Sequence, residues 1–121
     1  MYRIVIADDH ALLRQGIKSM ISQESEMEVI GEAANGEELL QLIEEVEPDM
    51  IILDISMPKI NGLEALELIH DKLPNVKILM LTMHKNSQYF FRAISSGAHG
   101  YLMKDETDTE LPAAIKMVRE G

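Results

Sequence analysis

The chain has 121 residues, of which 46% are apolar and 26% are charged, so it is long and apolar enough for one domain with a core. The sequence has no cysteine, which excludes a disulfide scaffold, a thiolate metal site and a cysteine nucleophile. The formal net charge of −10 argues against direct nucleic-acid binding by this domain, although it could regulate a basic domain attached to it.

Short apolar runs alternate along the chain with stretches of helical periodicity. Strands are predicted at 4–7, 27–33, 50–53, 76–81 and 100–103. The apolar faces of helices are predicted within 13–21, 39–46, 63–73, 90–94 and 111–118. Five strand–helix units with short links predict an α/β fold, in which helices cover both faces of a parallel sheet.

Helix boundaries are also marked in the sequence. Gly97 is a plausible helix end before the last strand. Three pairs have the spacing of a capping box or a close variant, namely Asn35 with Glu38, Asn61 with Glu64, and Thr107 with Glu110.

The amino terminus carries no targeting signal, since residues 1–7 run straight into the acidic pair Asp8 and Asp9. No apolar run approaches the roughly 20 residues that cross a bilayer. We therefore expect a cytoplasmic domain with no membrane association.

Polar residues follow four of the predicted strands at their carboxyl ends. Asp8 and Asp9 follow the first strand, Asp54 the third, Thr82 the fourth and Lys104 the fifth. That edge is the usual ligand-binding edge of an open α/β sheet, so we expect these side chains to meet there. Taken alone, each acid would more commonly cap a turn or helix, and Asp9 is a candidate cap for the first helix. Together, the five positions indicate a site.

Such a cluster has a definite chemistry. Two carboxylates roughly 4 Å apart repel by about 4 kcal/mol in a moderately polar protein environment. Gathered acids should therefore raise a pKa or recruit a cation, and oxygen ligands suit Mg²⁺. A carboxylate beside Mg²⁺, a lysine and a hydroxyl is equipped to accept a phosphoryl group as an acyl phosphate.

The sequence resembles the receiver domain of bacterial two-component response regulators over essentially its whole length. The matching motifs are IVIADDH at 4–10, DISMP at 54–58 followed by Gly62, Leu81 with Thr82, and GAHGYLMK at 97–104. The residues in and around these motifs are most similar to those of the subfamily with a C-terminal LuxR/NarL-type helix-turn-helix DNA-binding domain. The resemblance implies a flavodoxin-like, doubly wound sheet of order 2-1-3-4-5 with five helices. The receiver domain would fill 1–121, with the effector domain outside this sequence.

The resemblance also assigns roles. Asp54 is the phosphoacceptor and Lys104 pairs with the phosphoryl group. Mg²⁺, which Mn²⁺ can replace, is bound by Asp9, Asp54 and the backbone carbonyl of Ser56, with Asp8 acting directly or through water.

Further positions carry implied roles in switching and in tuning the site. Thr82 hydrogen-bonds the phosphoryl oxygens, and Tyr101 turns inward when Thr82 moves. Ser56 and His84 are the neighbours thought to tune dephosphorylation. Met83 stands where many receivers have a small residue, which affects the access of phosphodonors.

The stretch before the last helix departs from common patterns. Asp105 follows Lys104, where many receivers have a proline in a cis peptide, so this bond is either trans or a cis non-proline bond. Pro112 fits the first turn of a helix that begins at Thr109 and lies beyond it if Thr107 is the cap. An irregular helix start is therefore expected.

The function implied is a phosphorylation-activated switch that takes its phosphoryl group from a sensor histidine kinase and regulates a transcription-factor output. Such a domain is not a conventional enzyme, although it catalyses its own phosphoryl transfer and dephosphorylation.

A free-standing phosphorelay receiver is the main alternative. A small phosphatase with an aspartate nucleophile is disfavoured because Ser56 stands where those enzymes carry a second acid. A flavin- or nucleotide-binding domain is disfavoured because Asp8 and Asp9 replace a phosphate-binding loop.

The sequence contains further candidates for sites and surfaces. The histidines at 10, 70, 84 and 99 share no metal-ligand spacing, and His10 is expected to have a helix-start role. One of the aromatic side chains at 89–91 is a candidate partner contact. A homodimer favoured by phosphorylation is expected, through the first and last helices or around Tyr101. The side chains of the last helix expected to face the sheet are Leu111, Ile115 and Val118.

Overall fold

The structure is a computed structural model of residues 1–121, and it describes all of them except 58–60 and 84–86. Five parallel strands form one sheet in the order β2-β1-β3-β4-β5, which confirms the predicted flavodoxin-like topology. The strands are β1 (Tyr2–Ala7), β2 (Met27–Ala33), β3 (Met50–Asp54), β4 (Lys77–Thr82) and β5 (Gly100–Met103).

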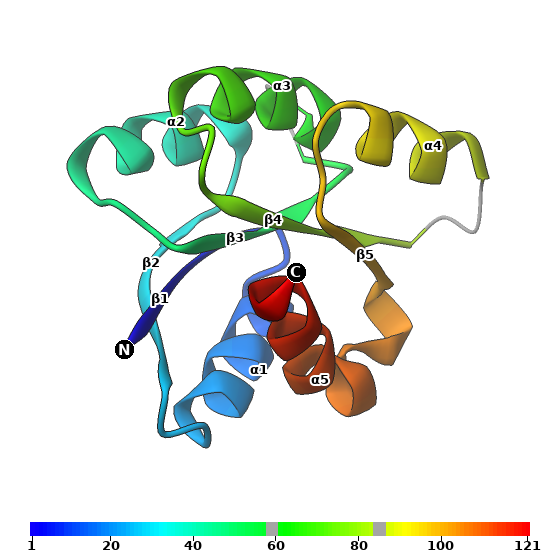
Figure 1. Cartoon of the computed structure of the whole chain (residues 1–121). Helices are drawn as coiled ribbons and strands as arrows, with labels where there is room; N and C mark the ends of the chain where they lie inside the picture. Colours follow the sequence, from blue (N-terminus) through cyan, green and yellow to red (C-terminus); the bar gives the residue numbers. More distant parts are fainter. Residues whose placement is uncertain (58–60, 84–86) are drawn as a thin grey trace.

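Helices cover both faces of the sheet (Figure 1). α1 (Ala11–Ser22) and α5 (Thr107–Glu120) lie on one face, while α2 (Gly36–Glu45), α3 (Gly62–Lys72) and α4 (Ser87–Ser95) lie on the other. None of the helices in the described part of the chain has the length and apolar character needed to span a bilayer.

The inner strands are apolar on both faces because each face is covered. In β1, Val5 packs into the core beneath α2 and α3, whereas Ile4 and Ile6 pack against α1 and α5. In β3, Ile51 and Ile52 divide between the two cores in the same way. This arrangement explains why these runs show no alternation of polar and apolar residues.

Most of the predicted helix boundaries are confirmed. The Asn35 side chain accepts a hydrogen bond from the backbone N–H of Glu38 at 2.9 Å, and Asn61 accepts one from Glu64 at 3.0 Å. Gly97 follows α4 in the left-handed region, with φ of +108°, and its N–H donates to the carbonyl of Ile94. These residues supply partners for backbone groups that helix ends leave unpaired.

The third predicted capping box is wrong. Thr107 is already helical, and its hydroxyl donates to the backbone carbonyl of Lys104 at 3.0 Å, because a 3-10 turn over Lys104–Glu106 leads directly into α5. This turn confirms the expected irregular start, with Pro112 inside the helix. The Lys104–Asp105 peptide bond is trans.

Candidate functional site

The register of the sheet brings the polar strand ends together. Ala7 of β1 is level with Leu53, Asp54 is level with Leu81, and Thr82 is level with Met103. Asp8 directly follows β1, and Lys104 directly follows β5. Both therefore lie at the same edge of the sheet as the other polar groups. The predicted cluster is therefore confirmed as a spatial neighbourhood. Its members with exposed fractions below 9% are Asp8, Asp54, Thr82 and Lys104.

A buried lysine bridges the two innermost acids. The Nζ atom of Lys104 lies 2.9 Å from Oδ2 of Asp8 and 3.0 Å from Oδ2 of Asp54. Both oxygens are buried and have no partner with hydrogen-bond geometry among the described residues, so these contacts are ion pairs. Without them, burying two carboxylates would be strongly unfavourable.

The environment makes the Asp54 carboxylate costly to ionise. Burial, together with the negative charge of Asp8, raises the pKa of Asp54 to about 6. The ion pair with Lys104 and the N–H of Ser56, which donates to Asp54 Oδ1 at 3.1 Å, oppose that rise in pKa. An added cation beside Asp54 would stabilise its ionised carboxylate, because it offsets the negative charge that burial and Asp8 disfavour.

Asp9 and His10 lie on the solvent-exposed side of the cluster. The Asp9 side chain is one-third exposed, at 34%, and His10 is 58% exposed. His10, and not Asp9, is the N-cap residue of α1, but its ring makes no cap hydrogen bond. Its Nδ1 atom instead lies 2.9 Å from Asp8 Oδ1 and 3.2 Å from Asp9 Oδ1. The expected role for His10 as a helix start is thus confirmed for its backbone alone.

Ligand atoms of Asp8, Asp9, His10 and Asp54 all lie within 4.8 Å of one another. Ligands on opposite sides of a small divalent ion with bonds of about 2.1 Å are roughly 4.2 Å apart, so a slight contraction would accommodate one. The carboxylate oxygens match the donors that Mg²⁺ prefers. The carboxylates of Asp8, Asp9 and Asp54 therefore fit a divalent cation, while the predicted Ser56 carbonyl, a backbone group, is not among the side-chain atoms of this cluster.

A glycine allows the chain after Asp54 to turn closely past α3. The N–H of Gly62 donates to the carbonyl of Ile55 at 2.7 Å. A Cβ atom at Gly62 would lie 2.7 Å from Cα of Ile55, closer than such atoms can approach. The loop beyond the candidate phosphoacceptor consequently depends on this glycine.

Two of the three residues that the resemblance implies as tuning residues lie at the surface. Ser56 and Met83 are exposed, Met83 to 68%. His84, and Pro58 of the DISMP motif, lie outside the described residues.

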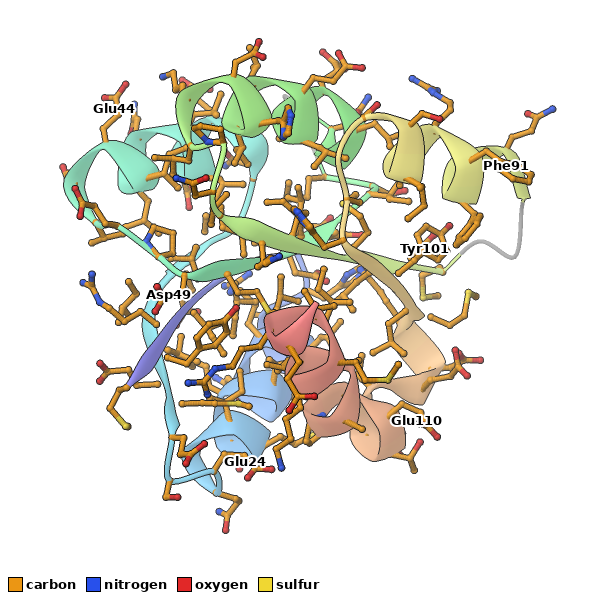
Figure 2. The ribbon with its side chains drawn as sticks, in the orientation of Figure 1. Glu24, Glu44, Asp49, Phe91, Tyr101 and Glu110 are labelled. Atoms are coloured by element: carbon orange, nitrogen blue, oxygen red, sulfur yellow. The ribbon has the colours of Figure 1, made fainter. Side chains whose placement is uncertain are left out.

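Tyr101 packs beneath α4 and away from the acidic cluster. Its ring makes an edge-to-face contact with Phe90, with centroids 5.3 Å apart, and its hydroxyl is buried without a hydrogen-bond partner in the described part of the chain. Figure 2 shows Tyr101 on β5, with Phe91 further out on α4. Phe91 is 64% exposed and Phe90 is 42% exposed, so two aromatic side chains of this group reach the surface where one was expected, while the Tyr89 side chain lies outside the description.

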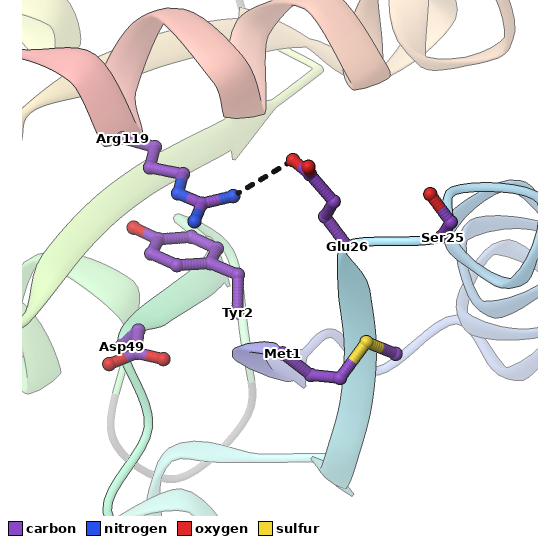
Figure 3. Close-up of a pocket in the computed structure, with 6 residues that line it drawn as sticks. All are labelled: Met1, Tyr2, Ser25, Glu26, Asp49 and Arg119. Atoms are coloured by element: carbon purple, nitrogen blue, oxygen red, sulfur yellow. Dashed lines mark ion pairs between the residues drawn. The ribbon is translucent and has the colours of Figure 1, made fainter.

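The hollow in Figure 3 lies at the opposite, amino-terminal edge of the sheet. It measures about 700 Å³, and its lining includes Tyr2, Glu26, Asp49 and Arg119. The Arg119 guanidinium stacks 4.6 Å from the Tyr2 ring centroid and pairs with Glu26 at 3.7 Å. These contacts fasten α5 to β1, and we assign the hollow no part in the chemistry of the acidic cluster.

Fold and site together define a doubly wound α/β domain with a lysine-bridged cluster of acidic side chains at the carboxyl edge of its sheet. The sequence model of the response regulator receiver domain matches residues 4–116. The chain belongs to that family.

Known relatives extend this comparison. The chain is 40% identical over 119 residues to the transcriptional regulatory protein DegU of Brevibacillus brevis, covering 98% of this chain and 50% of DegU. It is 42% identical over 120 residues to the oxygen regulatory protein NreC of Staphylococcus epidermidis, covering 98% of this chain and 55% of NreC. The chain thus spans about half the length of these curated relatives.

Solved structures of response regulators are also similar to this chain. A DNA-binding response regulator of the LuxR family from Staphylococcus aureus superimposes with a TM-score of 0.91 at 34% identity, over 98% of this chain and 99% of that one. The receiver domain of the response regulator NarL from Mycobacterium tuberculosis gives 0.92 at 32% identity, over 99% and 97%. These likenesses support the LuxR/NarL-type subfamily.

Proposed function

We propose that this domain is a signalling switch in which Asp54 accepts a phosphoryl group from a sensor histidine kinase. The observation that carries the proposal is the Lys104 ammonium, held 3.0 Å from a buried Asp54 carboxylate and 2.9 Å from Asp8. In the reaction, an Asp54 oxygen forms a bond to phosphorus as the bond between phosphorus and the donor nitrogen breaks. The domain itself catalyses this transfer and the later hydrolysis of the acyl phosphate.

Mg²⁺ is the proposed cofactor, with Mn²⁺ as a substitute. Asp9, Asp54 and the Ser56 carbonyl would hold it, and Asp8 would act directly or through water. When bound, the ion offsets negative charge on the carboxylates and on the incoming phosphoryl oxygens. Lys104 then pairs with the phosphoryl group, since its ammonium already lies beside the accepting carboxylate.

The proposed switch couples Thr82 to Tyr101. Thr82 is buried at the end of β4, next to the β3 end that carries Asp54. Its hydroxyl would move to hydrogen-bond a phosphoryl oxygen and vacate space that the Tyr101 ring fills. Rotation of that ring would alter its packing on Phe90 and thereby change the surface of α4 and β5. Met83, Ser56 and His84 would tune phosphodonor access and dephosphorylation.

For the output, we propose that residues 1–121 form the receiver part of a cytoplasmic transcription factor. The relatives support this, because DegU is a transcriptional regulatory protein about twice the length matched here. The receiver, with a net charge of −10, is poorly suited to bind DNA itself. A C-terminal helix-turn-helix domain would therefore bind the DNA. Phosphorylation would favour a homodimer. A free-standing phosphorelay receiver is the alternative, and a helix-turn-helix sequence after residue 121 would decide against it.

Intact-mass spectrometry tests the proposal. With Mg²⁺ and a small phosphodonor, the wild-type domain should gain the mass of one phosphoryl group. Asp54→Asn should gain none, whereas Asp71→Asn, which changes an exposed acid of α3, should behave as wild type. Equal labelling of Asp54→Asn would overturn the assignment.

A further inference from the structure

The His10 ring directs its Nδ1 atom toward the acidic cluster, while the side chain as a whole is 58% exposed. Its Nδ1 atom lies 2.9 Å from Asp8 Oδ1, 3.2 Å from Asp9 Oδ1 and 3.0 Å from Lys104 Nζ. The backbone N–H of His10 also donates to Asp8 Oδ1 at 2.7 Å, which fixes the start of the side chain beside that carboxylate. A single nitrogen atom therefore faces two acids and one ammonium group.

These contacts require opposite roles of the same nitrogen. A hydrogen on Nδ1 suits the oxygens of Asp8 and Asp9 but points at Lys104, which has only donors. A lone pair on Nδ1 can accept from Lys104, but it then faces two carboxylate oxygens at close range. A metal cation between Nδ1 and the two carboxylate oxygens attracts the lone pair and the carboxylates alike, and it displaces the Lys104 ammonium from Nδ1.

A second observation points to a cation at the same place. Oδ2 of Asp8 and Oδ2 of Asp54 are buried and have no hydrogen-bond partner in the described part of the chain, and the ammonium of Lys104 forms an ion pair with each of them. Ligand atoms from Asp8, Asp9, His10 and Asp54 lie within 4.8 Å of one another. The His10 side chain is also 58% exposed and the Asp9 side chain 34%, so the cluster borders solvent at these two residues.

We propose that His10 Nδ1 is a direct metal ligand, which gives this site one nitrogen donor beside its carboxylate oxygens. The inference rests on the proposed function, since it uses the same metal site. A nitrogen donor changes the preference of a site, because imidazole suits first-row transition ions such as Co²⁺, whereas Mg²⁺ prefers oxygen. His10 thereby shifts the site toward transition ions, and Lys104 loses one of its acceptors when the ion binds.

Pulsed electron paramagnetic resonance of the Mn²⁺-loaded domain tests this directly. The wild-type spectrum should contain the coupling of a directly bonded nitrogen. His10→Ala should lose that coupling, and His70→Ala, which removes an exposed histidine from α3, should keep it. His10→Asn offers an amide oxygen near the same position and should bind Mn²⁺ without nitrogen coupling.

Calorimetric titration with Co²⁺ and with Mg²⁺ gives the matching selectivity. The preference for Co²⁺ over Mg²⁺ should fall about tenfold in His10→Ala and stay at the wild-type value in His70→Ala. Asp9→Ala separates the two levels of the proposal. If metal binding is unchanged in Asp9→Ala, the metal site of the proposed function is wrong as well. If binding depends on Asp9 but wild type shows no nitrogen coupling and no loss of preference in His10→Ala, this inference alone is overturned.

Discussion

Asp54 shows how strongly the fold acts on a single side chain. It is 1% exposed and faces the charge of Asp8, and these two causes raise its pKa to about 6. The sequence predicts this crowding, because the acids follow neighbouring strands. The position of the His10 ring could not be predicted, since it depends on the backbone of the turn after β1 and on the contact with Lys104, 94 residues away.

We predict that Asp54→Asn stabilises the metal-free domain. The pKa of Asp54 rises from 3.8 in the unfolded chain to about 6 in the fold, so the native state binds more protons between these values. Wild-type stability therefore falls as pH rises through that window. At neutral pH the variant should have a free energy of unfolding about 1 to 3 kcal/mol higher, measured by urea denaturation in a chelator.

Asp71→Asn removes the same charge from an exposed position and is the matched control. It should shift the free energy of unfolding by less than about 0.5 kcal/mol. If Asp54→Asn is instead less stable than wild type, the ion pair with Lys104 outweighs the cost of burying Asp54.

His99 supplies a second pH effect, of opposite sign. Its Nδ1 accepts a hydrogen bond from the Ile78 backbone N–H at 3.1 Å, which requires an unprotonated nitrogen. Burial, reinforced by the positive charges of Lys77 and His70, lowers the pKa of His99 below 6.5. The unfolded chain therefore binds this proton more readily, and stability from His99 is lost as pH falls through and below that value.

We expect His99→Gln, which keeps an acceptor that does not titrate, to flatten this dependence. The urea midpoint of the wild type, relative to that of the variant, should decrease between about pH 7.5 and about pH 5.5. The opposing contribution of Asp54 is common to both proteins and cancels in the comparison. Parallel curves for the two proteins would show that His99 does not contribute.

At the scale of elements, α5 packs on the sheet through a row of apolar side chains. Leu111, Ile115 and Val118 are buried against the sheet, as predicted from their spacing. The strand ends were also predicted closely, because apolar runs stop where the sheet meets solvent. The wrong capping box at Thr107 shows the limit of spacing rules. Because a 3-10 turn precedes α5, the Thr107 hydroxyl donates to the carbonyl of Lys104 and does not cap the helix.

Gly100→Ala should loosen this packing. A Cβ atom there would lie 2.6 Å from Cγ2 of Val118 and 3.0 Å from Cδ1 of Leu79, so the Val118 side chain, or α5 with it, must shift. The free energy of unfolding should fall by about 1 to 3 kcal/mol. Gly16→Ala in α1 is the control, because nothing lies within 4 Å of its added Cβ. That change should stabilise the domain by about 0.5 to 1 kcal/mol, and equal effects of the two changes would contradict the packing argument.

At the scale of the whole molecule, the acidic cluster and the α4–β5 surface are linked through β4 and β5. Thr82 ends β4 beside the cluster, and Tyr101 is level with Met80 on the same strand pair. Two packing states that differ by a few kcal/mol would suffice for phosphorylation to shift their populations. The sequence predicts the participants, but it could not predict that Tyr101 packs edge-to-face on Phe90, with a buried hydroxyl that has no hydrogen-bond partner among the described residues.

We predict that Thr82→Ala still accepts a phosphoryl group on Asp54 but couples it poorly to Tyr101. Nuclear magnetic resonance of the phosphorylated variant should show shifts near Asp54 and much smaller ones across α4 and β5 than in wild type. Shifts of wild-type size across both elements would show that Thr82 is not the coupling residue.

Reduction of the phosphorylated domain with borohydride tests the central claim most directly, because an acyl phosphate on an aspartate is reduced to homoserine at that position. After treatment with Mg²⁺ and a small phosphodonor, peptide mass spectrometry should find homoserine at position 54 and aspartate at positions 8 and 9. Homoserine at either of those positions, or a phosphoryl group on a histidine or serine with Asp54 unchanged, would contradict the account.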